Sequence, residues 1–320
     1  MGEAVPPQVD VLCFGEPMLE FNQLPRSEDD PRTLYLEGHG GDTSNAAIAA
    51  ARSGARAGYL TAIGRDAAGD SFMELWAREG VDTTHVLRDP EAPTGVYFVT
   101  HGPEGHCFTF YRTGSAASRY RPEDLPEAAI RGARVLHLSG ISQAISTSAC
   151  DAGFRAIEIA RAAGVKVSYD TNLRLRLWPV RRAAAVIHAA VALADIVFPS
   201  LEDAEALTGL ADPDAIADFY LRLCPLVLLK LGREGAMLCT RAGRTRIPAH
   251  KVEAVDATGA GDTFAGAFLA RHIAAGEGPL AAARYANAAA ALATTGYGAV
   301  APIPRREQVL ALLSGEGGAG

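Results

Sequence analysis

Residues 256–268 read DATGAGDTFAGAF and place one carboxylate, Asp262, directly after glycines at positions 259 and 261. Glycine permits positive φ angles and close approach of a ligand, and a helix that begins here directs unpaired N–H groups at whatever lies in front of it. Such a helix start suits an anion. Because Asp262 is itself an anion, it either caps the helix or removes a proton from a bound molecule.

Several known catalytic and binding motifs are absent, and their absence excludes some kinds of reaction. No GxxxxGK[ST] segment occurs, and GAGDTF lacks the third glycine of the dinucleotide fingerprint because Phe264 takes its place. GxSxG and HExxH are also missing, and the eight histidines lie far apart, so acyl transfer and zinc hydrolysis lack their minimal residues. A carboxylate beside a glycine-rich helix start fits phosphoryl transfer, with the carboxylate as proton acceptor. From this stretch alone, base and cap remain equal alternatives.

Alternating strand and helix patterns surround this motif. A buried strand at 9–14 runs into Gly15, and strands alternate with helices from 42 to 80 and from 133 to 209. This alternation predicts a mostly parallel sheet with helices on both faces, and ligands bind beyond the carboxyl ends of the strands in such sheets. Further strands are predicted at 225–232, 235–243 and 245–255, and further helices at 262–276 and 280–296. The polar residues expected at the ligand edge are Glu16, Asp170, Asn172, Arg174, Ser200, Gly232 and Asp262.

Two segments interrupt the alternation. Residues 19–38 read as a hairpin-like excursion, and residues 95–113 contain two aromatic-rich strands around a Pro-Glu-Gly turn. We expect the two hairpins to pair in space as a small second sheet. The expected core comprises residues 9–18, 39–94 and 114–313, and the glycine-rich residues 314–320 are expected to form a flexible tail.

The composition excludes several classes of protein. A chain of 320 residues that is 48% hydrophobic is large enough for one α/β domain with a small companion. The net charge of −7 and the scattered arginines argue against a nucleic-acid partner. Five cysteines without a CxxC pair predict reduced core thiols and a cytoplasmic location. The longest apolar stretch is too short to span a bilayer, and the N-terminus does not read as a secretion signal, so no membrane partner is expected.

DATGAGDTFAGAF closely resembles the C-terminal signature of the ribokinase-like (PfkB) carbohydrate kinases, and GGDTSNAAIAAARSG at residues 40–54 resembles their N-terminal glycine-rich segment. The resemblance covers nearly the whole chain, and the two hairpins are similar to the family's β-sheet lid. It implies a ribokinase-like three-layer αβα core, ATP as phosphoryl donor, Mg²⁺ as its partner and a homo-oligomer formed through the lid. A requirement for a monovalent cation such as K⁺ is left open.

By the same resemblance, Asp262 is the general base of the reaction. The amides of Ala260 and Gly261 are assigned to the anion hole beside it, and Gly259 is assigned to the same catalytic segment. Those assigned to the sugar in the N-terminal segment are Gly41, Asp42 and Asn45, of which the last two alternatively cap the helix that follows.

Four more segments resemble one branch of the family, the 2-keto-3-deoxygluconate kinases. They are GEPMLEF at 15–21, FYRTGSAAS at 110–118, YDTNLRLRLW at 169–178 and PSLEDAEALTG at 199–209. This branch implies ATP-dependent phosphorylation of the 6-hydroxyl of 2-keto-3-deoxygluconate. The alternatives are a kinase of a neutral sugar such as fructose or ribose, a nucleoside kinase, and a sugar sensor without catalysis.

A sugar acid needs cationic partners for its carboxylate, and arginine suits that planar group through paired hydrogen bonds. Arg112 and Arg174 lie in the matching segments and are assigned to the substrate, although each also suits a solvated strand end or loop. Tyr97 and Tyr111 are assigned to the wall of the sugar site or, alternatively, to packing. Two further residues are assigned to the substrate, Asp170 and Asn172.

The nucleotide assignments come from the resemblance. They comprise Ser200, Lys230, Gly232, Gly235 and Asn287, together with Gly259 and Gly261 at the helix start. Many ribokinase-like enzymes carry Asn-x-x-Glu where this chain has Ser200-Leu-Glu-Asp203. Asp203 keeps a carboxylate that is shorter by one methylene, and it is assigned to the metal through water.

Overall fold

The structure is a computed structural model that describes residues 9–24, 32–102 and 105–315. Within these residues, the larger of two sheets has nine strands in the order β13-β12-β11-β10-β9-β8-β1-β4-β5. Its strands, in chain order, are β1 (Val9–Phe14), β4 (Ala57–Gly64), β5 (Val86–Asp89), β8 (Ala133–Ser139), β9 (Lys166–Asp170), β10 (Ile196–Phe198), β11 (Leu226–Lys230), β12 (Ala236–Thr240) and β13 (Gly243–Ile247).

This sheet is mostly parallel and deeply buried. Every residue of β1 and β4 is buried, as expected for central strands covered on both faces. Only the ladders β11–β12 and β12–β13 are antiparallel among the described strand pairs of this sheet. The predicted mostly parallel sheet is confirmed.

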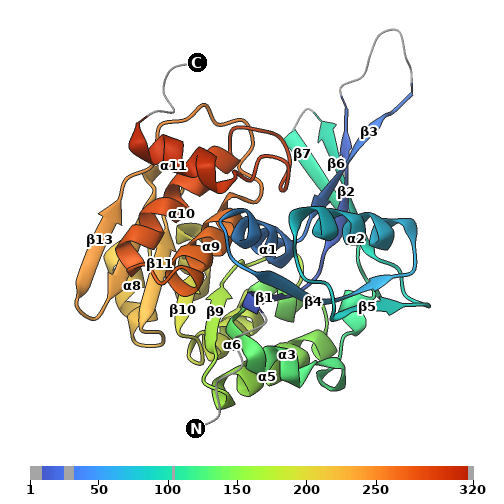
Figure 1. The fold of residues 1–320 in the computed structure, drawn as a ribbon, viewed down its shortest axis with the longest axis horizontal. Helices are drawn as coiled ribbons and strands as arrows, with labels where there is room; N and C mark the ends of the chain where they lie inside the picture. The colour runs from blue at the N-terminus through green and yellow to red at the C-terminus, as the bar shows by residue number, and fades with distance from the viewer. Residues whose placement is uncertain (1–8, 25–31, 103–104, 316–320) are drawn as a thin grey trace.

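Helices cover both faces of the sheet and create two hydrophobic cores. One core is shared by α1 (Asp42–Arg52), α2 (Ala67–Glu79), α9 (Ala260–Leu269), α10 (Pro279–Ala293) and α11 (Arg306–Ser314). The other is shared by α3 (Glu127–Gly132), α4 (Gly140–Ala144), α5 (Thr147–Ala162), α6 (Val180–Val191), α7 (Leu201–Thr208) and α8 (Pro213–Leu221). Figure 1 shows α1, α9 and α10 packed side by side. The three-layer αβα core is therefore confirmed.

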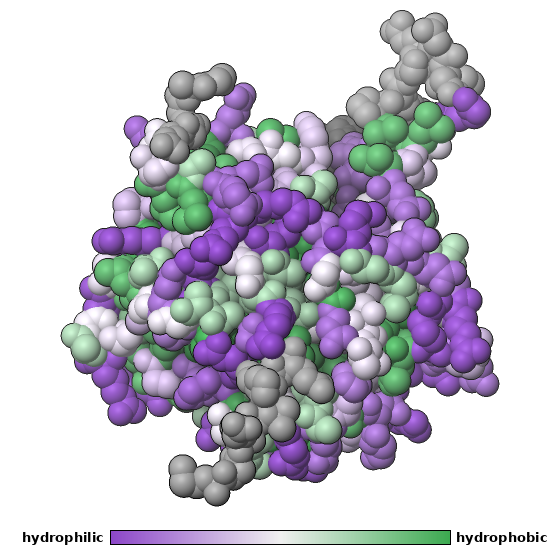
Figure 2. All heavy atoms as spheres, viewed as in Figure 1, coloured by the Kyte–Doolittle hydropathy of each residue, from purple (hydrophilic) through white to green (hydrophobic). Residues whose placement is uncertain are grey.

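The smaller sheet projects from the core beside α2 (Figure 1). Its strands are β2 (Met18–Gln23), β3 (Tyr35–Gly40), β6 (Gly95–Gly102) and β7 (Gly105–Tyr111), in the order β3-β2-β6-β7. The two predicted hairpins thus pair through the parallel ladder between β2 and β6. Apolar side chains gather over this sheet in Figure 2, and its exposed apolar residues include Tyr35, Leu36, Phe110 and Tyr111.

Two expectations were wrong in detail. The strand predicted at 245–255 ends at Ile247, because Pro248 has no N–H group and the pairing with β12 ends there. All five cysteines are free, and four are buried as predicted, but Cys107 lies exposed on the small sheet. Both predicted hairpin turns fall partly outside the described residues. The predicted tail of 314–320 begins too early, because Ser314 is the last residue of α11 and Gly315 is its C-cap. Residues 316–320 of that tail lie outside the described residues. Among the described helices, none is long and apolar enough to cross a membrane.

Candidate active site

The candidate residues converge at the carboxyl ends of the central strands. Asp170 is the last residue of β9, and Lys230 is the last residue of β11. Lys230 Nζ lies 2.7 Å from Asp170 Oδ2. Asp42 opens α1, and Gly259 is the N-cap of α9. These elements are therefore gathered at the sheet edge predicted for ligand binding.

The small residues after Asp262 bring α9 against α1. A Cβ on Gly266 would lie 2.1 Å from the carbonyl oxygen of Ala46, so only glycine allows this approach of the two helices. At the start of the same pair, Asn45 Nδ2 donates to Asp262 Oδ2 over 2.9 Å. The close packing thus holds the carboxylate of Asp262, which belongs to α9, against Asn45 at the start of α1.

Asp262 does not cap its helix. The N-cap is Gly259, in the left-handed conformation with φ 76°, and no described side chain caps this helix start. A Cβ on Gly259 would also lie 2.8 Å from the carbonyl oxygen of Ala299. The capping alternative for Asp262 is therefore wrong. Ala260 N donates to Ala257 O over 3.2 Å, so this amide, predicted for the anion hole, is engaged in a turn.

The surroundings of Asp262 disfavour its charged form. Its pKa is raised to about 7, first by burial and next by the negative charge of Asp42. The hydrogen bond from Asn45 and the positive charge of Lys230 act in the opposite direction. A carboxylate that titrates near neutrality is well matched to accept a proton from an attacking hydroxyl.

Asp42 and Asp170 are linked through Asn172. The side-chain amide of Asn172 donates to Asp42 Oδ2 over 2.8 Å, and its backbone N–H donates to Asp170 Oδ1 over 3.2 Å. Asn172 has φ 29°, a conformation that residues other than glycine rarely adopt and that is frequent at functional sites. Neither Asp42 nor Asn45 is the N-cap of α1, because Gly41 holds that position. The capping alternative is wrong for both.

The cluster carries an excess of negative charge. The pKa of Asp170 is raised, first by burial and also by the charges of Asp203 and Asp42, whereas Lys230 opposes the shift. Asp262 lies close enough to Asp170 and Asp42 for both charges to raise its own pKa. Lys230 alone therefore does not balance these carboxylates, and a bound cation would be stabilised here.

Asp203 is tied to the loop that carries the predicted substrate residues. Its Oδ2 accepts from Thr171 Oγ1 over 3.2 Å and from Leu173 N over 3.1 Å. Ser200 Oγ accepts from the backbone N–H of Asp203 and caps α7. Both contacts with the loop use Oδ2, so Oδ1 of Asp203 makes neither of them.

The residues predicted to bind the nucleotide differ in their surroundings: some lie in open space and others pack against neighbouring loops. Lys230 Nζ lies beside the start of α9, 3.2 Å from where a Cβ of Gly261 would be. Gly235 has a packing role, because its φ is 96° and a Cβ would lie 2.1 Å from the carbonyl oxygen of Ile247. Gly232 has φ 56° and open space around it. The buried Asn287 donates to Pro248 O over 2.8 Å and fixes the chain after β13.

The two arginines predicted for the substrate differ in environment. Arg112 follows β7, its side chain is 13% exposed, and its Nη2 donates to the fully buried carboxylate of Glu16. Arg174 is exposed, and its Nη1 donates to the carbonyl oxygen of Leu173 over 2.9 Å. Arg112 is thus fixed in an ion pair, whereas Arg174 contacts its own loop.

Tyr97 and Tyr111 lie on opposite faces of the small sheet, because Tyr97 pairs with Phe110 and Tyr111 pairs with Val96. Tyr111 contacts the ring of Phe98 and is 62% exposed. The prediction that both tyrosines line one wall of the sugar site is therefore wrong. Phe110 occupies the face of Tyr97, with ring centroids 5.6 Å apart.

The face that carries Tyr97 is turned toward the candidate site. The pKa of Tyr97 is raised, first by burial and next by the charge of Glu20, and the charge of Asp262 also contributes. The Tyr97 hydroxyl donates to Glu20, which lies opposite it on β2. A Cβ on Gly40 would lie 2.7 Å from this hydroxyl, so Tyr97 sits over the glycines that precede α1.

Sequence reasoning missed two polar residues around this site, Glu20 and Arg176, and it missed the partner of a third, Glu16. Glu20 was detectable, since period-two alternation along 18–23 puts it on one face of a strand. Glu16 was expected at the ligand edge, but no local pattern pairs it with Arg112, 96 residues away. Arg176 donates from Nη1 to the carbonyl oxygen of Phe108 over 2.9 Å and joins the loop after β9 to the small sheet.

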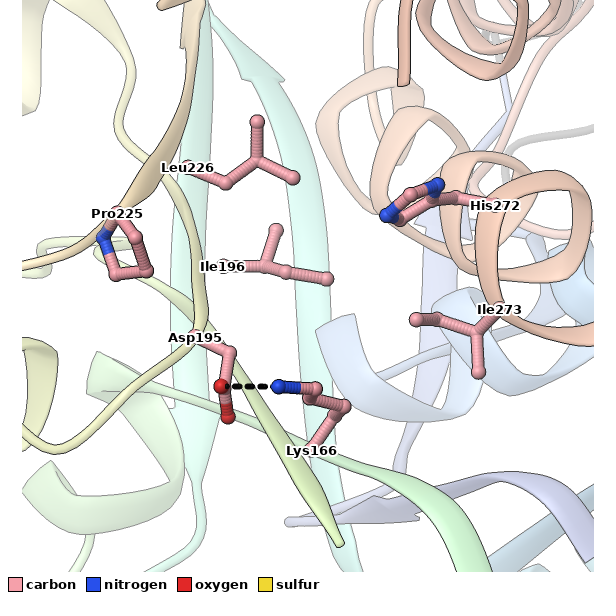
Figure 3. Close-up of a pocket in the computed structure, with 7 residues that line it drawn as sticks. All are labelled: Lys166, Asp195, Ile196, Pro225, Leu226, His272 and Ile273. Atoms are coloured by element: carbon pink, nitrogen blue, oxygen red, sulfur yellow. Dashed lines mark hydrogen bonds and ion pairs between the residues drawn. The ribbon is translucent and has the colours of Figure 1, made fainter. Parts of the chain in front are cut away.

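A cavity of about 190 Å³ lies elsewhere, at the amino ends of β9, β10 and β11. Its lining residues are Lys166, Asp195, Ile196, Pro225, Leu226, His272 and Ile273 (Figure 3). Because Asp170 and Lys230 end the same strands on the opposite side, this cavity is separate from the candidate site.

Comparisons with known proteins agree with this geometry. Residues 8–306 match the model of the pfkB family carbohydrate kinases. The chain is 35% identical to the 2-dehydro-3-deoxygluconokinase of Thermoproteus tenax over 315 residues, covering 94% of each protein. It is also 35% identical to fructokinase-1 of Oryza sativa subsp. japonica over 317 residues, covering 95% of this chain and 97% of that one.

A solved structure of an Escherichia coli protein described as a ribokinase II in complex with ATP and Mg²⁺ superposes with a TM-score of 0.86. It is 26% identical in sequence, and the match covers 96% of this chain and 99% of that one. The likeness therefore extends over both sheets rather than over the segment 256–268 alone.

Proposed function

Because this chain belongs to the PfkB family of carbohydrate kinases, we propose that it transfers the terminal phosphoryl group of ATP to the 6-hydroxyl of 2-keto-3-deoxygluconate. The observation that carries kinase chemistry is Asp262, which has a raised pKa and stands on the first turn of α9, held by Asn45. The substrate is supported by the 2-dehydro-3-deoxygluconokinase relative and by Arg174, which follows Leu173 in the loop bonded to Asp203.

In this proposal Asp262 accepts the hydroxyl proton as the new O–P bond forms and the bond to the ADP leaving group breaks. The N–H groups at the start of α9, above all that of Gly261, stabilise charge on the transferring phosphoryl group. Asp42 and Asn45 hold sugar hydroxyls, and Gly41 gives the backbone close approach. Asn172, whose backbone N–H is bonded to Asp170, orients the Asp42 side chain through the hydrogen bond from its amide.

The acidic cluster fits a magnesium ion. Mg²⁺ prefers oxygen ligands, keeps several waters and is commonly held by one or two carboxylates. Asp203, with an oxygen outside its loop contacts, and Asp170, whose charge Lys230 only partly offsets, would hold it, directly or through water. When bound, the ion would neutralise charge on the phosphates. Whether the reaction also requires a monovalent cation is a separate question, which activity assays with and without K⁺ would answer.

ATP is proposed to lie along the carboxyl end of β11, next to Lys230 and the start of α9. Ser200 and Gly232 are proposed to line its phosphates, since Ser200 pairs with Lys230 through a backbone bridge and Gly232 has open space around it. Gly235 and Asn287 would shape the site through the loop that they pack against. Support for ATP comes from the family and from the ATP complex of the E. coli structure.

The small sheet, formed by β2, β3, β6 and β7, is proposed to act as a lid that covers the sugar. Tyr97 and Phe110 would face the sugar, whereas Tyr111 and other exposed apolar residues of this sheet would join two copies of the chain. A cytoplasmic location is proposed from the free cysteines.

A second candidate is the kinase of a neutral ketose such as fructose. The ion pair with Glu16 offsets the charge of Arg112, and the surrounding cluster is acidic. Both features disfavour a substrate carboxylate. The rice fructokinase is also as similar to this chain as the sugar-acid kinase.

A coupled ADP-release assay over keto-deoxy sugar acids, neutral ketoses and nucleosides decides between the two. A charge-assisted hydrogen bond contributes roughly 1.5–3 kcal/mol, so kcat/KM for the acid should exceed that for fructose by about tenfold or more. A higher kcat/KM for fructose would establish the second candidate instead.

A further inference from the structure

Glu16 is a buried carboxylate with no part in the proton transfer proposed for Asp262. Its side chain is fully buried. One carboxylate oxygen accepts from Arg112 Nη2, and the other accepts from Ser115 Oγ over 2.5 Å. Because a buried charge persists only when it is paired and hydrogen-bonded, the position of Glu16 and that of Arg112 depend on each other.

The backbone around Glu16 leaves it little freedom. A Cβ on Gly95, at the start of β6, would lie 3.1 Å from Glu16 Oε1. A Cβ on Gly41, ahead of α1, would lie 2.5 Å from the Glu16 carbonyl oxygen. Glu16 is thus enclosed where the core strand β1, the helix α1 and the small sheet meet. The carboxylate therefore fixes Arg112 at this junction.

Arg112 keeps an unused donor in this position. Its Nε is buried, and no hydrogen-bond acceptor meets it among the described residues. Guanidinium donors form a rigid planar fork, so the bond from Nη2 to Glu16 also sets the direction of Nε. A buried donor without a partner is costly, and an acceptor oxygen of a ligand would remove that cost.

We propose that Glu16 is a positioning residue that orients Arg112 toward an acceptor oxygen of the sugar substrate. This inference rests on the proposed function, because it concerns how the sugar binds at the same active site. Glu16 touches no substrate in this proposal and acts through Arg112.

The test compares variants on 2-keto-3-deoxygluconate and on fructose. Glu16→Ala should raise KM for the sugar acid about tenfold, while kcat and KM for MgATP stay within about twofold. Glu79→Ala is the control, because the side chain of Glu79 is 3% exposed and is paired with Arg52, away from the site. The control should lower stability without changing KM for either sugar.

A double-mutant cycle separates positioning from a structural role. Arg112→Gln should also raise KM, and Glu16→Ala should add no further increase in the Arg112→Gln background. If Glu16→Ala fails to fold, Glu16→Asp replaces it, since this variant keeps the charge but withdraws the carboxylate. It should raise KM about threefold or more in the wild-type background and not in the Arg112→Gln background.

Equal KM increases in both backgrounds, or an unchanged KM in the wild-type background, would overturn the proposal. If the wild-type enzyme phosphorylates fructose and not the sugar acid, the proposed function fails instead. The cycle is then measured with fructose, where coupling between positions 16 and 112 supports the positioning role and additivity contradicts it.

Discussion

At the scale of single residues, Asp262 is defined by two properties, a pKa raised to about 7 and a hydrogen bond from Asn45. The raised pKa makes the carboxylate basic enough to take a proton near neutral pH. The bond from Asn45 directs one oxygen to α1 and leaves the other for a substrate hydroxyl. The same burial that creates the base also disfavours its charged form in the folded protein.

The raised pKa of Asp262 predicts a pH dependence of the reaction. Because the base must be unprotonated, kcat/KM should rise with pH through about 7 and level off above it. Because the pKa is higher in the folded than in the unfolded chain, the contribution of Asp262 to stability is greatest below about pH 4 and is lost as the pH rises through about 7. A pH profile of kcat/KM that stays flat across neutrality would contradict the assignment.

Replacing Arg174 tests the predicted preference for a sugar acid over a neutral ketose. If this exposed arginine binds the carboxylate of a sugar acid, Arg174→Ala should reduce kcat/KM for the acid about ten- to a hundredfold. The loss for fructose should be much smaller, since a neutral ketose has no carboxylate to bind. Arg181→Ala, which removes an exposed arginine at the start of α6, is the control. Equal losses for acid and ketose would mean that Arg174 supports the loop or the phosphates.

At the scale of elements, the site depends on the close packing of α1 and α9. Asn45 and Asp262 are 217 residues apart in the sequence, and they meet because Gly266 lets α9 approach the backbone of α1. A displaced helix would separate the base from its hydrogen-bond donor and from the sugar residues of α1.

Gly266→Ala tests this dependence. The added Cβ would lie 2.1 Å from Ala46 O, so the helices must separate, at a cost of about 1–3 kcal/mol in stability and with a reduced kcat. Gly132→Ala is the control, because no atom lies within 4 Å of its added Cβ. Thermal unfolding and steady-state kinetics measure both effects. A Gly266→Ala enzyme with unchanged stability and kcat would show that the packing is not critical.

Elements with a clear hydrophobic pattern were predictable from the sequence. Elements whose position depends on a capping residue or a proline were not. The buried run of β1 and the strand and helix alternation through α7 specified most of the large sheet. Helix α8 went unpredicted, although Asp212 caps it and Pro213 occupies its first turn. The strand beyond Ile247 was overpredicted because the break at Pro248 was overlooked.

At the scale of the whole molecule, the small sheet is joined to the core by polar contacts from distant segments. Arg112 reaches Glu16 after β1, and Arg176 reaches the carbonyl oxygen of Phe108 on β7. Sequence reasoning singled out the motifs at 40–45 and 256–262, which the structure brings together, since each is a continuous segment. It could not predict contacts between distant segments, which depend on helix packing and loops. It also could not predict that Tyr111 faces away from Tyr97, because the strand register decides this.

Substrate binding should slow amide hydrogen exchange in the small sheet if this sheet is a lid. We expect protection at 95–102 and 105–113 when sugar and nucleotide are added together, measured by mass spectrometry. Strand β13, at the far edge of the large sheet, serves as an internal control that should not change. Unchanged exchange in the small sheet would remove the lid assignment.

The central claim is that Asp262 is the base of a sugar kinase, and kcat of Asp262→Asn tests it most directly. Asparagine keeps the shape of the side chain and an oxygen for the hydrogen bond from Asn45, but it cannot take the proton. We expect kcat to fall by about 10²–10⁴-fold. ATP affinity should be retained, and thermal stability at pH 8 should equal or exceed that of the wild type, because the neutral amide removes a buried charge. A variant that turns over within about threefold of wild type, far above that range, would show that Asp262 is not the base.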